Sequence, residues 1–182
     1  MKRFILTGAP GAGKTAILRA LEGQGFAVVE EAATDVCASD QARGATEPWT
    51  SPRFVDDIVA LQRAREEAAG AGHRPVVIFD RSPVCTLALA RHLEFAPTDA
   101  LRQELARIER ESVYERRVFF VDSLGFVVNT EIRRIDLTEA TRFGRLHEQV
   151  YGELGYELVH IGPGPVDERA DAVAASIAAW MS

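Results

Sequence analysis

Five short apolar runs recur along the chain, and each has the length and composition of a β-strand. They are rich in Val, Ile and Phe, and few polar residues interrupt them, as expected for strands that are buried on both faces of a sheet. The runs occupy residues 4–7, 26–30, 75–80, 117–122 and 157–162. We therefore predict a β-strand at each of these positions.

The segments between the runs carry apolar residues at helical spacing. In the first segment Ile17, Leu18 and Leu21 share one helix face, and a glycine two residues later is a stop signal. Later helices are predicted over about 52–70, 82–94, 98–113, 137–154 and 166–181. The stretches 39–53 and 123–136 lack such spacing and are expected to be irregular loops.

The alternation of strands and helices decides the fold class. It is typical of an α/β protein with a parallel sheet that helices cover on both faces. The chain has 182 residues and shows no internal repeat or linker. We therefore expect one domain, spanning residues 1–182.

The first strand leads directly into the motif GAPGAGKT, Gly8–Thr15, which fits the pattern G-x-x-x-x-G-K-[ST]. A strand, a glycine-rich loop and a helix in this order form a phosphate-binding P-loop, in which backbone N–H groups surround the anion. Lys14 is expected to reach the β- and γ-phosphates of ATP, and the Thr15 hydroxyl is expected to bind Mg²⁺. The predicted nucleotide-binding residues are Gly8, Ala9, Pro10, Gly11, Ala12, Gly13, Lys14, Thr15 and Ala16.

Composition and charge exclude several classes of partner. The formal net charge is −6, so no overall attraction to nucleic acid or acidic lipid is expected. No apolar run approaches the length of a membrane helix, and the first strand begins so early that a signal peptide has no room. We expect a cytoplasmic protein, with Cys37 and Cys85 as buried free thiols.

Charged residues follow two of the predicted strands. Ligands of open parallel sheets bind at the carboxyl ends of the strands, where Asp80, Arg81 and Ser82 are expected. Asp80 is suited to hold Mg²⁺ beside the P-loop, and Arg81 is suited to meet a phosphate. Asp122 ends another strand and competes with Asp80 for the metal, while Asp80 could instead simply form a turn.

A glutamate pair follows the second strand. Glu31 could act as general base on a substrate hydroxyl, with Glu30 as its rival, or it could cap a helix that begins at about residue 32. Four arginines gather farther along, and a lid carrying one of Arg133 and Arg134 would stabilise a transferring phosphoryl group. The other two are Arg142 and Arg145, and a solvated basic face is the alternative.

Other side chains are candidates for contacts with a second substrate. Trp49 could stack on an acceptor, Gln62 could recognise a polar group, Arg65 could help to orient it, and Phe54 fits the core better. His147 lies on an apolar helix face and is expected to be a hydrogen-bonded core residue. The remaining histidines show no pattern of partners: His73, His92 and His160.

Several segments together resemble a known family. They are GAPGAGKT, VVEEAATDV, VVIFDRS, RVFFVD and RFGRLHEQVYGELGYELVHIGPGPVDER. These segments are similar to those of small single-domain P-loop "AAA domain" ATPase and kinase-like proteins, which are related to nucleoside and nicotinamide-riboside kinases. The likeness spans nearly the whole chain, and the last segment is its most family-specific part.

This resemblance implies a sheet of order 2-3-1-4-5 and a lid after the fourth strand, at about 123–145. It also implies that Glu31 is the general base, that the DRS stretch lies at the transfer site, and that Arg169 lies against the adenine. The chain lacks an N-K-x-D stretch for guanine and an Asp-Glu pair after an apolar strand. It also lacks the helical subdomain of ring-forming relatives.

We therefore expect an ATP- and Mg²⁺-dependent kinase that phosphorylates a hydroxyl of a nucleoside-like, sugar-like or antibiotic-like molecule. The alternative is a nucleotide-dependent switch with slow hydrolysis and no acceptor. The sequence identifies neither the acceptor nor the oligomeric state.

Overall fold

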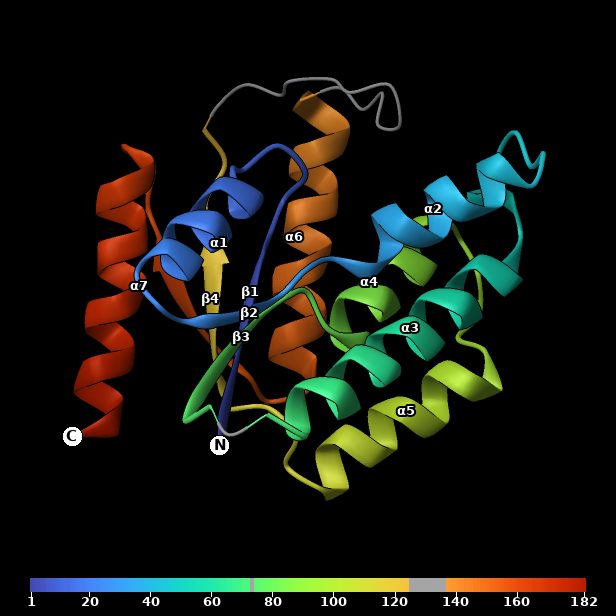
Figure 1. Ribbon diagram of the computed structural model, residues 1–182. Helices are drawn as coiled ribbons and strands as arrows, with labels where there is room; N and C mark the ends of the chain where they lie inside the picture. The colour runs from blue at the N-terminus through green and yellow to red at the C-terminus, as the bar shows by residue number, and fades with distance from the viewer. Residues whose placement is uncertain (73, 125–136) are drawn as a thin grey trace.

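The computed structural model describes residues 1–72, 74–124 and 137–182, in which five strands form one parallel sheet (Figure 1). The strands are β1 (Lys2–Gly8), β2 (Ala27–Val29), β3 (Val76–Asp80), β4 (Arg117–Val121) and β5 (Glu157–Ile161). Their order is β2-β3-β1-β4-β5. The predicted strands, their order and the α/β fold class are confirmed.

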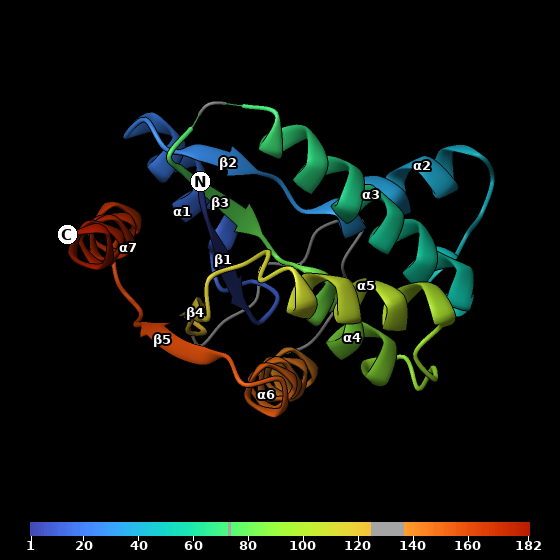
Figure 2. The same cartoon turned by 90° about the horizontal axis from the view of Figure 1, so that it is seen from below.

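Helices cover both faces of this sheet (Figure 2). They are α1 (Lys14–Gly23), α2 (Ala32–Ala42), α3 (Pro52–Gly70), α4 (Pro83–His92), α5 (Asp99–Arg110), α6 (Leu137–Glu153) and α7 (Val166–Met181). Alternate residues of β1 point to opposite faces. Phe4 and Leu6 pack in a core with α1 and α7, whereas Ile5 packs in a second core with α3, α4 and α6.

The central position of β1 decides where chemistry can occur. Leu6 pairs with Asp80 of β3, and Gly8 pairs with Val121 of β4. The loop that leaves β1 is therefore flanked by the carboxyl ends of both neighbours. This is the edge at which the sequence predicts the ligand site.

The expectation of an irregular loop over 39–53 is partly wrong. Helix α2 continues to Ala42, and a short 3-10 helix covers Pro48–Thr50. The sequence of α2 is AATDVCASDQA, in which apolar residues show only a weak helical pattern. The helix buries only Ala32, Val36 and Cys37. Those three side chains pack against Phe54 and Ile58 of α3, so tertiary packing rather than periodicity supports this helix.

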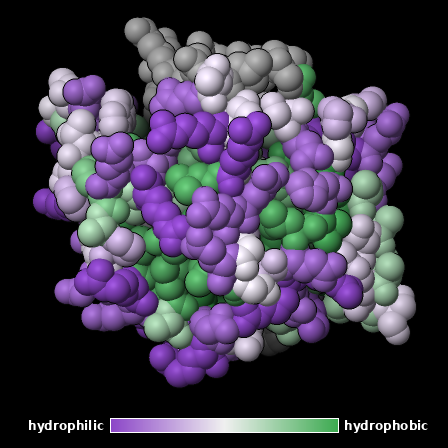
Figure 3. Space-filling view, turned by 180° about the vertical axis from the view of Figure 1, so that it is seen from behind, coloured by the Kyte–Doolittle hydropathy of each residue, from purple (hydrophilic) through white to green (hydrophobic). Residues whose placement is uncertain are grey.

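The outer surface is mainly polar. Figure 3, viewed from behind Figure 1, shows hydrophilic residues with apolar residues gathered in patches between them. No helix in the described ranges is both long enough and apolar enough to cross a membrane.

Gly8 is the residue whose conformation sets the start of the P-loop. Its φ is +135°, a value that side-chain-bearing residues rarely adopt. A Cβ atom at this position would overlap the carbonyl oxygen of Val121 in β4. Only glycine lets β1 approach β4 this closely while the chain turns into the loop.

We predict that Gly8→Ala destabilises the protein by at least about 2 kcal/mol, because backbone strain adds to the overlap with β4. Urea denaturation gives the free energy of unfolding. The control is Gly152→Ala in α6, where an added Cβ has no neighbour within 4 Å. That change should be neutral or stabilising by up to about 1 kcal/mol. Equal losses in the two variants would contradict the assigned role of Gly8.

Candidate functional site

The P-loop wraps around the ammonium group of Lys14. Gly13 is the N-cap of α1, with a left-handed φ of 87°, and Lys14 is the first residue of the helix. Lys14 Nζ donates hydrogen bonds to the backbone carbonyls of Gly8 at 3.2 Å and Ala9 at 2.8 Å. The lysine is buried, whereas Thr15 is exposed. The cation and the N-terminus of α1 thus lie together in one loop, which suits a phosphate group.

Arg169 of α7 supports this loop from the protein side. Its guanidinium donates to the carbonyl of Ala12 at 2.9 Å and to the carbonyl of Asp122 at 3.1 Å, and the side chain is buried. Burial lowers the pKa of Arg169, although the Asp122 carboxylate opposes this. Arg169 thus lies beside the P-loop, and its stacking on adenine stays a prediction.

The two candidate metal-binding carboxylates have different surroundings. Asp80 is buried at the end of β3, beside the P-loop strand. Asp122 follows β4, is about one-third exposed, and its Oδ1 lies 2.8 Å from Nδ1 of His160. His160 therefore has a partner that the sequence did not indicate. Asp80 has the more enclosed position of the two.

The residues after Asp80 begin α4 in a constrained conformation. Arg81 has a φ of 73°, unusual for a residue with a side chain, and its N–H donates to the carbonyl of Leu6 at 3.0 Å. Ser82 is the N-cap of α4 and Pro83 occupies the first turn, a combination that favours helix initiation. The sequence D-R-S-P thus turns the chain sharply and directs the Arg81 side chain into the site.

The Arg81 guanidinium joins two distant parts of the chain. Its Nε donates to Oε1 of Glu31 at 2.5 Å, and NH1 lies 2.8 Å from Nε2 of His147. Glu31 also accepts a hydrogen bond from the Thr34 hydroxyl at 2.7 Å. Burial is the largest single influence and works to lower the pKa of Arg81. The charges of Glu31, Cys85 and Asp80, together with the hydrogen bond to Glu31, outweigh it, so the pKa is raised overall.

His147 is neutral, and its tautomer follows from its partners. Nδ1 lies 2.8 Å from the carbonyl of Phe143, which can only accept, so Nδ1 carries the hydrogen. Nε2 then accepts from Arg81, which can only donate. The expectation of a buried, hydrogen-bonded histidine is confirmed.

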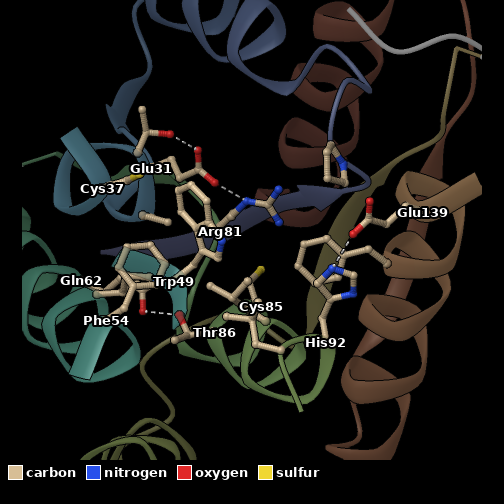
Figure 4. Close-up of a pocket in the computed structure, with 17 residues that line it drawn as sticks. Glu31, Cys37, Trp49, Phe54, Gln62, Arg81, Cys85, Thr86, His92 and Glu139 are labelled. Carbon is tan, nitrogen blue, oxygen red and sulfur yellow. Dashed lines mark hydrogen bonds and ion pairs between the residues drawn. The ribbon is translucent and has the colours of Figure 1, made fainter. Parts of the chain in front are cut away.

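Beside this charged group lies a cavity of about 340 Å³ (Figure 4). Pro10 of the P-loop, Glu31 and Arg81 line one part of it. Figure 4 shows Gln62 and Thr86 away from Arg81, joined by a hydrogen bond of 2.9 Å. The apolar wall includes Ala33, Trp49, Phe54, Ile58, Leu89, Leu93 and Phe143.

Sequence reasoning found part of this wall. Trp49, Phe54 and Gln62 line the cavity, and Phe54 also belongs to the core, as expected. Arg65 does not line it, because its guanidinium binds the Asp35 carboxylate and the Glu30 carbonyl. The wall residues that the sequence did not predict include Cys37, Cys85, Thr86, His92 and Glu139.

The spacing of some of these residues in the sequence could have placed them on the cavity wall. Cys85, Leu89 and His92 recur every three or four residues, which places them on one face of α4. His92 was expected to lack a partner, but its Nε2 lies 3.3 Å from Oε1 of Glu139, and its ring stacks on Phe143. The two cysteines are buried thiols that are not joined in a disulfide, as predicted. Arg133, Arg134 and His73 lie outside the described residues.

Comparison with known proteins agrees with this architecture. Residues 3–169 match a protein family described as an AAA domain. The chain belongs to the AAA domain family. The P-loop and the family match together support nucleotide binding by this AAA domain. A search of curated protein sequences returns no match.

A solved structure shares the fold of this AAA domain. It is described as the NadR protein in complex with NAD and AMP-PNP, and it superposes with a TM-score of 0.66 at 15% sequence identity. The alignment covers 96% of this chain and 48% of the NadR chain, so the AAA domain spans about half the length of that protein. At this identity the likeness establishes the fold.

The surroundings of His147 predict how the stability of the AAA domain depends on pH. Burial is the main reason why the pKa of His147 lies well below 6.5, and the charge of Arg81 lowers it further. Lys14 acts in the same direction, whereas Phe143 and Glu31 oppose it. Below pH 6.5 the unfolded chain therefore binds a proton that the folded protein does not.

We predict that the free energy of unfolding decreases as the pH falls from about 6.5 to 5, by up to about 1.4 kcal/mol per pH unit from this residue. His147→Gln removes the titrating group and should flatten the profile in this range, whatever its effect at pH 8. Urea titrations at fixed pH values measure both profiles. Parallel profiles would show that His147 is not the titrating residue.

Proposed function

We propose that this AAA domain is a kinase that transfers the γ-phosphate of ATP to a hydroxyl group of a small molecule. One observation carries the proposal: the Glu31–Arg81 ion pair and Pro10 of the P-loop line the same largely apolar cavity. A hydroxyl held in this cavity would lie between a carboxylate and the phosphate-binding loop. General-base catalysis of phosphoryl transfer needs this order of groups.

The described side chains have the chemistry for each part of the transfer. Glu31 would take the proton from the acceptor hydroxyl while the hydroxyl oxygen forms a bond to the γ-phosphorus. The bond from that phosphorus to the β,γ-bridging oxygen breaks, and ADP keeps the electron pair. Lys14 and Arg81 would stabilise the negative charge on the transferring group. Arg133 and Arg134 remain predicted lid residues.

Thr15 and Asp80 are the residues that would hold Mg²⁺. The exposed Thr15 hydroxyl stands at the start of α1, and the Asp80 carboxylate lies at the end of the adjacent strand. One hydroxyl and one carboxylate suit Mg²⁺, which takes its other ligands from phosphates and water. The ion would neutralise charge on the phosphates. Asp122 is less suited because His160 already binds its carboxylate.

The cavity also limits the acceptor. Its volume of about 340 Å³ is at the small end of ligand pockets. Trp49 and Phe54 offer aromatic surface, and the Gln62 amide and the Thr86 hydroxyl offer polar contacts. AMP-PNP and NAD in the NadR complex make nucleoside-like alcohols the first choice for a substrate panel, before sugar-like and antibiotic-like alcohols.

Nucleotide binding is tested with the two lysines of the chain, Lys14 and Lys2. We predict that Lys14→Ala weakens Mg-ATP binding by about 10- to 100-fold, because charge-assisted hydrogen bonds to phosphate are lost. Lys2 pairs with Glu115 at the surface, so Lys2→Ala should bind as the wild type does. Isothermal titration calorimetry measures both affinities. Unchanged affinity in the Lys14 variant would remove the basis of the P-loop assignment.

Catalysis is tested with the adjacent glutamates. At least one hydroxyl compound of the panel should raise ADP release well above basal hydrolysis. We predict that Glu31→Gln lowers this stimulated rate by about 10² to 10⁴-fold, because the base is lost. Glu30 is exposed and does not line the cavity, so Glu30→Gln should retain the rate.

Two results would distinguish a wrong assignment of the base from a wrong assignment as a kinase. If Glu31→Gln kept the stimulated rate, the assignment of the base would be wrong. If Mg-ATP bound tightly but no compound stimulated turnover, the alternative of a nucleotide-dependent switch would replace the kinase.

A further inference from the structure

A second hollow lies between the end of α4 and the first half of α6. Its volume is about 780 Å³, and α4 contributes Arg91 and His92 to its lining. Helix α6 contributes Thr138, Thr141, Arg142, Arg145, Leu146 and Gln149. His92 also lines the 340 Å³ cavity beside Glu31 and Arg81, which we call the acceptor cavity because the proposed kinase would hold its acceptor there, so the two hollows are neighbours. We call the second hollow the α4–α6 groove.

The groove concentrates positive charge on an acidic protein. Three arginines line it, and none of its lining residues in the described part of the chain is an Asp or a Glu, although the net charge of the chain is −6. Arg91 is paired with Glu153 at 2.7 Å. Arg142 and Arg145 are exposed and form no ion pair within the described ranges. The carboxylates nearest to them on the helix belong to Glu139, which pairs with His92, and to Glu148.

The positions of Arg142 and Arg145 in α6 bring two like charges together. Arg142 and Arg145 are three residues apart in α6, so their like charges are neighbours on the helix surface and repel. Thr138 and Thr141 belong to the first turns of the same helix, where the helix dipole favours an anion. The three arginines of the groove can only donate hydrogen bonds, and the other polar side chains that line it can donate as well as accept.

The groove is distinct from the P-loop. The side of α6 that faces the loop is the Gly144 side, since a Cβ atom added there would lie 3.1 Å from Cβ of Ala9. Phe143 lines the acceptor cavity. Arg142 and Arg145 line the groove, and the expectation that they belong to a lid stays a prediction.

We propose that the α4–α6 groove binds a phosphate group, with Arg142 and Arg145 as its principal ligands. Two guanidinium groups supply the paired N–H donors that match phosphate oxygens, and the threonine hydroxyls can complete the contacts. The phosphate is either a free ion or a group carried by the acceptor, whose hydroxyl end would then lie past His92 in the neighbouring cavity. The case in which the acceptor carries the phosphate rests on the proposed kinase function, whereas binding of the free ion does not.

Site-resolved NMR tests the proposal without requiring catalysis. The probe is inorganic phosphate, titrated at constant ionic strength into protein labelled with ¹⁵N-arginine, and the Nε–Hε signals of the two arginines are assigned with Arg142→Lys and Arg145→Lys. Both signals should shift along one saturating curve. Arg102 and Arg110 of α5 line neither hollow, and their signals should stay in place.

A charge-matched pair of variants provides the second measurement. Phosphate affinity is measured by calorimetry in a Lys14→Ala background, which weakens competing binding at the P-loop. We predict that Arg142→Ala/Arg145→Ala lowers the groove affinity at least tenfold, whereas Arg102→Ala/Arg110→Ala, with the same loss of charge, lowers it less than twofold. Equal losses in both double variants, or NMR shifts that chloride reproduces, would overturn the proposal.

The source of the phosphate is decided with acceptors that differ only in a phosphate group. If the acceptor carries it, Arg142→Ala/Arg145→Ala should raise KM for the phosphorylated acceptor at least tenfold, with kcat and KM for ATP unchanged. If KM is also unchanged while phosphate still saturates the arginine signals, the groove binds the free ion. If no acceptor is found at all, the proposed kinase fails, and the NMR result still decides the groove.

Discussion

The candidate site depends on the ion pair between Arg81 and Glu31. Arg81 follows β3, Glu31 is the N-cap of α2, and His147 of α6 accepts the second hydrogen bond of the guanidinium. A strand end and two helices that lie far apart in sequence are therefore joined by one side chain. Each of these elements contributes to the wall of the acceptor cavity or to its border with the P-loop, so this guanidinium defines the cavity.

Burying a charged guanidinium has a large desolvation free energy, and the groups around Arg81 offset it. A buried guanidinium needs both an opposite charge and hydrogen-bond acceptors. Glu31 supplies the charge, and a neutral His147 supplies an acceptor without adding positive charge. The left-handed backbone of Arg81 is strained, yet its N–H bonds to Leu6 of β1 and the next residue caps α4. Strain of this kind at a cleft is typical of functional sites.

The sequence predicted those parts of the fold and site that depend on local patterns. Apolar runs identified the strands, the glycine motif identified the P-loop, and the rule that ligands bind at strand ends identified Asp80, Arg81 and Glu31. Helix α2 was foreseen only as an alternative, a helix beginning at about residue 32, because its sequence has little periodicity and contacts with α3 bury it. His92 and Glu139 were missed because their pairing depends on how α4 packs against α6, which no local pattern encodes.

The cavity wall bears on the choice between hydrolysis and transfer to an acceptor. A water-activating ATPase needs a polar residue near the γ-phosphate, but it does not need an apolar chamber beside it. Here Trp49 and Phe54 face the same space as Glu31, and Gln62 and Thr86 provide polar contacts away from Arg81. Apolar walls with a few placed polar groups suit an organic ligand, and a bound ligand would exclude water from the carboxylate. This arrangement supports transfer to a bound hydroxyl more than transfer to water.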